Sequence, residues 1–148
     1  MSDKTDTAVE NGVASFLHPD ERVNAVLIAS VRGHQQAMVG GVAGIIGGGR
    51  AGKARQAAES VGVNLTSPMA FVLTHGRLIT VQTGGGGKVI RLLNEFVLSE
   101  VGAMTVSRVG LGASVTMRIR GVDVKLESRV GAARAFAEEF DRVKADQY

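Results

Sequence analysis

A glycine-rich segment in the first half of the chain contains residue types that could bind a phosphate group. Residues 38–53 read MVGGVAGIIGGGRAGK and carry no charge before Arg50. Gly47 to Lys53 fits G-x-x-x-x-G-K, the pattern in which backbone N–H groups and a lysine cradle nucleotide phosphates. That loop needs serine or threonine after the lysine to hold Mg²⁺, and here Ala54 follows. A nucleotide-binding enzyme using Gly47–Lys53 is therefore only a remote alternative.

The same glycines also fit the dinucleotide pattern G-x-G-x-x-G, with Gly47, Gly49 and Gly52 at the three positions. A dinucleotide site needs an acidic residue about 20 positions further on, after a second strand. The next acids are Glu59, inside an expected helix, and then Glu95. In a stretch this rich in glycine the match is easily obtained by chance, so we do not favour this interpretation.

A third interpretation places the glycines on one side of a helix. Gly40, Gly44, Gly48 and Gly52 recur every four residues. Such a row makes a groove that lets another backbone approach closely. Each glycine costs roughly 0.8–1 kcal/mol against alanine in a helix. This helix would therefore need a partner, which could be the rest of its own domain, a second copy or lipid.

Basic residues follow the glycine row directly and could orient it against a protein or against lipid phosphates. Gly33 to Gly49 is 17 uncharged residues, at the lower limit for a membrane span, and it contains His34 and two glutamines. A surface-lying or self-associating helix is more plausible than a true span. The candidate partner- or lipid-binding residues are Gly40, Gly44, Ile45, Ile46, Gly48, Arg50, Lys53 and Arg55.

Other candidates for chemistry are weak. The three histidines stand apart, without metal-ligand spacing, and the chain has no cysteine. Glu95 and Glu100 are better explained as solvated surface residues than as an acid–base pair. We therefore predict no catalytic residue, no metal site and no cofactor. The best basic patch on the β part is the set Arg118, Arg120 and Lys125, expected on the outer face of one hairpin.

Composition and charge indicate one domain with an uneven charge distribution. The chain has 148 residues, 45% of them hydrophobic but only 4% aromatic, so aliphatic side chains must build the core. Residues 22–125 hold twelve Lys/Arg against four acids, whereas residues 1–21 hold one against five. The scarcity of aromatic residues argues against nucleic-acid binding by base stacking. The polar, acidic residues 1–12 predict a disordered leader.

Patterning predicts mostly β-structure closed by a helix. We expect a strand over 22–32, a helical insertion over about 35–61, and a bend over 94–102. The last segment, 129–145, predicts a helix capped by Ser128, with an apolar stripe that includes Phe136 and Phe140. The further strands are expected at 69–74, 77–83, 88–93, 103–109, 114–120 and 122–127.

This order of about seven strands and a final amphipathic helix resembles the bacterial pleckstrin-homology-like (PH-like) domains. The local matches are FVLTHGRLIT, residues 71–80, and FVLSEVGAM, residues 96–104. The resemblance covers residues 17–33 and 69–145, whereas residues 34–68 depart from the family pattern. It implies an α+β fold, a split β-barrel of antiparallel strands with a C-terminal capping helix, and a binding or scaffold role rather than catalysis.

We therefore expect a leader over 1–12 and a single PH-like domain over 13–148, with a glycine-rich helical insertion after the first strand. The expected function is a non-enzymatic binding or assembly module acting through the insertion. Its expected partner is another protein, most simply a second copy of the chain. The alternative is peripheral association with an anionic membrane surface through the same residues. Absence of cysteine favours a cytoplasmic protein, at the inner face of the membrane in the alternative.

Overall fold

A computed structural model describes residues 4–31, 59–66, 68–110 and 112–147 of the chain. Two helices flank the β-structure, α1 (Lys4–Val13) and α4 (Val130–Gln147). Short 3-10 turns are η1 (Ala14–Phe16), η2 (Gly85–Gly87) and η3 (Leu98–Glu100). The strands are β1 (Val23–Val31), β2 (Met69–Thr74), β3 (Arg77–Thr83), β4 (Val89–Val97), β5 (Val101–Val109), β6 (Gly112–Ile119) and β7 (Val122–Arg129).

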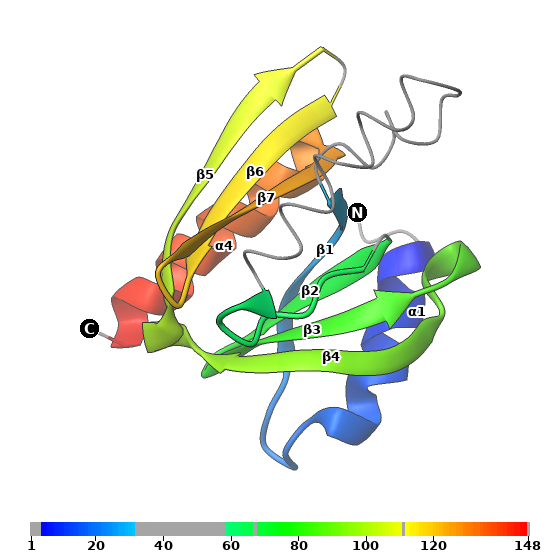
Figure 1. Cartoon of the computed structure of the whole chain (residues 1–148). Coiled ribbons are helices and arrows are strands. Elements are labelled where there is room, and N and C mark those ends of the chain that lie inside the picture. The colour runs from blue at the N-terminus through cyan, green and yellow to red at the C-terminus, as the bar shows by residue number, and fades with distance from the viewer. Residues whose placement is uncertain (1–3, 32–58, 67, 111, 148) are drawn as a thin grey trace.

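The strands form one seven-stranded antiparallel sheet in the order β4-β3-β2-β1-β7-β6-β5. β1 joins two halves, because Val23–Ala29 pair with β2 whereas Ser30 and Val31 pair with β7. Figure 1 shows the β2–β4 half and the β5–β7 half turned toward each other, with α4 against the second half. β4 and β5 are the outer strands, so the sheet is not closed. The predicted antiparallel sheet with a C-terminal helix is confirmed.

Apolar residues on the inner faces of both halves make the main core. Alternate residues of a strand point to opposite faces, so Phe71 and Leu73 of β2 enter this core together with Leu78 of β3. The predicted stripe of α4 covers it, with Phe136 and Phe140 fully buried. The inner faces and α4 are therefore one hydrophobic unit.

A second, smaller core lies on the outer face of the β2–β4 half. Ala70 and Val72 of β2 and Ile79 and Val81 of β3 are fully buried there. Helix α1 covers them, through residues in the region where the sequence predicts a disordered leader. The structure differs from that prediction because this helix packs against the sheet, a long-range contact that its polar composition does not indicate.

The predicted strands 69–74 and 77–83 match β2 and β3 residue for residue. The expected bend over 94–102 is shorter: β4 continues to Val97, and η3 then leads directly into β5. Asn94 and Glu95 extend the strand because their polar side chains have partners, described below. Within the described part of the chain, neither helix has the length and apolar character needed to cross a bilayer.

Candidate functional site

The predicted partner- or lipid-binding residues lie outside the described residues. This applies to Gly40, Gly44, Ile45, Ile46, Gly48, Arg50, Lys53 and Arg55, all within 32–58. The structure shows instead how the chain on either side of this region is held. The candidate site is therefore built from those flanking residues and the side chains that fix them.

The segment Val61–Leu65, here called the anchor segment, enters the main core after the insertion. Val63 is 1% exposed and Leu65 is 7% exposed, while the alternate residues Gly62 and Asn64 are exposed. Gly62 has a φ of +82° and its N–H donates to the Glu59 carbonyl at 3.0 Å. That geometry is expected where a helix ends in glycine, as the sequence predicts for Gly62.

Asn94 on β4 holds the anchor segment from one side. Its side-chain oxygen accepts from the Asn64 N–H at 2.7 Å, and its amide nitrogen donates to the Gly62 carbonyl at 2.8 Å. One amide side chain thus imitates the backbone of a neighbouring strand, donating and accepting together. The anchor segment is bound beside an outer strand without a regular ladder.

Arg120, in the turn between β6 and β7, holds the anchor segment from the other half of the sheet. Its Nη1 donates to the Val61 carbonyl at 3.0 Å, and its Nε pairs with Glu100 at 2.6 Å. The guanidinium also lies 5.1 Å from the centre of the Phe96 ring, within cation–π range. Arg120 therefore ties β4, η3 and the anchor segment to the β6–β7 turn.

The backbone and charge at Arg120 fit this tethering role. Arg120 has a φ of +51°, and no other non-glycine residue in the described part of the chain has a positive φ. Its N–H donates to the Glu100 carbonyl at 3.0 Å. The hydrogen bond from Arg120 lowers the pKa of Glu100 and keeps that carboxylate ionised. Uncommon backbone conformations of this kind persist where surrounding contacts fix them.

The chain before the insertion is fixed where β1 crosses from β2 to β7. Ser30 and Val31 pair with Glu127 and Leu126 of β7. The Ser128 hydroxyl, predicted to cap the last helix, donates to the Ile28 carbonyl at 2.7 Å. That bond ties the end of β7, just before α4, to β1, so both flanks of the insertion are attached to the sheet.

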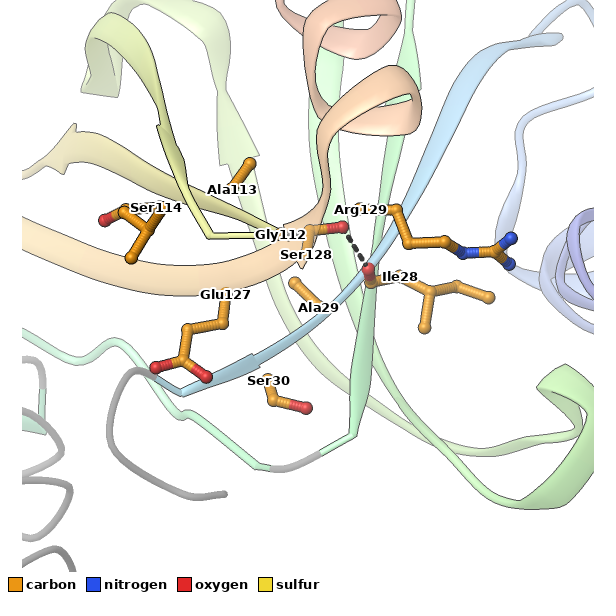
Figure 2. A pocket seen from close by; sticks show the side chains of 10 residues that line it. Ile28, Ala29, Ser30, Gly112, Ala113, Ser114, Glu127, Ser128 and Arg129 are labelled. Atoms are coloured by element: carbon orange, nitrogen blue, oxygen red, sulfur yellow. Dashed lines mark hydrogen bonds between the residues drawn. The ribbon is translucent and has the colours of Figure 1, made fainter. Parts of the chain in front are cut away.

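A cavity of about 570 Å³ lies at this crossing, and Figure 2 shows its lining. Polar side chains there include Ser30, Ser114 and Glu127. In Figure 2 Arg129 extends away from Glu127, and the serine hydroxyls point in different directions. These groups do not converge on one point, which recognition of a small polar ligand would need.

A groove of about 640 Å³ continues from this cavity across β1, between α1 and α4. Asp6 and Glu10 of α1 and Glu139 of α4 line it, together with Arg129. Its α4 side is formed by small residues, including Gly131 and Ala135. The groove is an extended surface with mixed charge, suited to contact with a polypeptide.

A second ionic cluster, centred on Arg77, is structural. Its guanidinium pairs with Glu21 and with Glu95, each at 2.6 Å, and donates to the Phe16 carbonyl at 2.7 Å. Glu21 also accepts from the Thr74 hydroxyl at 2.7 Å. These bonds, led by the one from Arg77, lower the pKa of Glu21 to about 2. A carboxylate that is ionised and held by several hydrogen bonds at neutral pH is not a proton-transfer group there.

The predicted basic patch is largely neutralised. Arg118 pairs with Asp123 at 3.2 Å, and Arg120 pairs with Glu100, so only Lys125 of the three lies outside these pairs. Glu95 and Glu100 each pair with an arginine, which explains them without acid–base chemistry. In the described residues no group of three or more His, Cys, Asp or Glu side chains could hold a metal ion.

The sequence did not indicate the residues that hold the anchor segment. Asn94 and Arg120 contact backbone groups 32 and 59 positions away, and local patterning does not report such pairs. A scan against protein-family models found no match, and a search of curated proteins found none either.

Proposed function

We propose that this chain is a non-enzymatic assembly module of PH-like architecture whose insertion, residues 35–61, contacts another protein, first of all a second copy of itself. The PH-like assignment is supported by the strand order and by a C-terminal helix packed over the inner core. The resemblance of residues 71–80 and 96–104 to that family adds to this support.

The observation that carries the proposal is the double attachment of the insertion. Ser128 and β7 hold the chain before it, while Asn94 and Arg120 hold the anchor segment after it. Fixed ends reduce the ordering that a binding segment must undergo when it meets its partner. A glycine row presented from fixed ends suits close packing of one backbone against another.

Light scattering after size-exclusion chromatography tests the proposal. The full chain should show a mass that rises above 15.4 kDa with concentration. Replacing residues 35–58 by a short Gly/Ser linker, with the anchor segment retained, should give a monomer at every concentration. An unchanged mass in this variant would contradict the proposal.

A matched pair of substitutions locates the contact. Gly44→Leu fills the glycine row and should abolish self-association. Gly76→Leu adds the same side chain in the exposed β2–β3 turn, where an added Cβ meets nothing within 4 Å, and should leave the mass unchanged. Salt-sensitive sedimentation with phosphatidylserine vesicles, but not phosphatidylcholine vesicles, by a monomeric chain would favour membrane association instead.

A further inference from the structure

Helix α1 has little helical tendency of its own. Seven of its ten residues are threonine, aspartate, asparagine, glycine or valine. All of these residue types are poorer helix formers than alanine, and Gly12 is the poorest. Isolated helices of this length are marginal in water even with favourable sequences. The helix therefore forms because it docks on the sheet.

Two valines carry that docking. Val9 and Val13 are fully buried against Ala70, Val72, Ile79 and Val81, the apolar outer face of β2 and β3. Here this set of four sheet residues is called the outer apolar face. Since helix formation and docking occur together, α1 should open locally more readily than the sheet beneath it.

The chain directly after α1 is attached to the sheet independently of the helix. Arg77 donates to the Phe16 carbonyl at 2.7 Å and pairs with Glu21. This clamp lies beyond the last residue of the helix, so α1 can open about Ala14 and Ser15 without breaking it. Opening then exposes the outer apolar face while the rest of the fold is retained.

Basic residues stand on two sides of α1. Lys88 is exposed directly after η2, which contacts α1. Arg129 lines the groove on another side, together with Asp6 and Glu10 of α1. Asp6 and Glu10 leave with α1, and Glu139 of the same groove pairs with Arg142. The site then combines an apolar floor with positive charge at Lys88 and Arg129, which is complementary to an acidic helix with apolar residues on one face.

We propose that the outer apolar face is a helix-docking site, held in cis by α1 and open to an acidic amphipathic helix of a partner protein. This inference does not rest on the insertion, and its test is independent of the test for self-association. Because the site is free only while α1 is open, the partner's apparent affinity is reduced by the open fraction.

The probe is a fluorescently labelled synthetic peptide with the sequence of residues 1–17, which carries one lysine against three acids. Fluorescence anisotropy should show saturable binding to the full chain. Val9→Asp removes a buried apolar contact of α1, so it should tighten peptide binding at least about tenfold by raising the open fraction. A peptide with its three acids changed to lysine should bind at least about tenfold more weakly.

A disulfide that holds α1 closed, here called the lock, should lower the open fraction instead of raising it. The chain has no cysteine, and a Cβ at Gly12 would lie 2.7 Å from the Val89 Cβ. A disulfide needs about 3.8 Å, so a Gly12→Cys, Val89→Cys variant can close after a shift of about 1 Å. The oxidised lock should abolish peptide binding, and reduction should restore it.

Three outcomes would overturn the proposal. One is binding that the lock leaves unchanged, and another is equal binding of the acidic and charge-reversed peptides. The third is a disulfide between separate Gly12→Cys and Val89→Cys chains mixed together, which would assign the face to α1 of a second copy.

Discussion

Arg77 is the residue on which the N-terminal part of the fold depends most. Its guanidinium joins β3 to β4 through Glu95, and to the turn before β1 through Glu21 and the Phe16 carbonyl. Arg77 and Glu21 are 12% and 11% exposed, so removing one partner leaves a nearly buried charge. Breaking such a pair costs more than the pair contributes by forming.

Glu21→Gln should therefore lower the free energy of unfolding at pH 7 by roughly 2–3 kcal/mol. The pKa of Glu21 falls from 4.5 to about 2 on folding, so its contribution is complete above pH 4.5. It is lost as the pH falls from 4.5 toward 2. Urea unfolding across this range should show the variant and the wild type converging at low pH. Glu138→Gln, exposed on α4, is the control, and an equal effect there would contradict the assignment.

Arg120 has a comparable role in the β6–β7 turn, and Arg118, two positions earlier, provides a matched control. Arg120→Ala removes the Glu100 pair and the bond to the Val61 carbonyl. We expect a loss of about 1–3 kcal/mol and faster hydrogen exchange over residues 59–66. Arg118→Ala removes only an exposed pair with Asp123, for which about 0–1 kcal/mol is expected. Equal exchange over residues 59–66 in both variants would show that Arg120 does not hold the anchor segment.

At the scale of elements, two adjacent positions in α1 distinguish the effect of helix propensity on stability from the effect of packing. Asn11 and Gly12 are adjacent poor helix formers, but Asn11 is exposed whereas a Cβ at Gly12 would lie 2.5 Å from Val89 Cγ2. Asn11→Ala should stabilise the protein by about 0.5 kcal/mol, as propensity alone predicts. Gly12→Ala should destabilise it, although propensity predicts a gain of about 1 kcal/mol.

Thermal unfolding followed by circular dichroism compares the two variants. The expected result is a small rise in Tm for Asn11→Ala and a fall for Gly12→Ala. A rise for both would mean that α1 does not pack closely on β4.

The strands were predictable where a short apolar run is bounded by turn residues. β2 and β3 are short apolar strands around the His75-Gly76 turn, and both are confirmed to the residue. The last part of β4 was not predicted, because Asn94 and Glu95 look like loop residues until their partners are known. Those partners are the anchor segment and Arg77, both distant in sequence.

At the scale of the whole molecule, the sequence predicted the fold class but not how its parts are joined. Periodicity shows which face of a strand is apolar, but not that β1 pairs with both β2 and β7. It also missed α1, whose helical form depends on contact with a sheet face that lies some 60 residues further along the chain. The candidate site residues in 32–58 remain predictions, and the residues that flank them were found only through long-range contacts.

The shared strand β1 makes the two halves of the sheet one cooperative unit. Leu27 of β1 is fully buried in the core that contains residues of β2, β3, β6 and β7. Leu27→Ala should therefore cost about 2–5 kcal/mol. Native-state hydrogen exchange should show the same loss of protection for the amides of β3 and of β6.

Val109→Ala is the control, because Val109 is 58% exposed at the end of an outer strand and should change stability by no more than about 0.5 kcal/mol. The informative result is how the loss of amide protection in β3 compares with the loss in β6 of the Leu27→Ala variant. If β3 lost protection and β6 kept it, the halves would unfold separately, and β1 would be a link between two units. An equal loss means that the core, rather than the backbone pairing at Ser30 and Val31 alone, joins them.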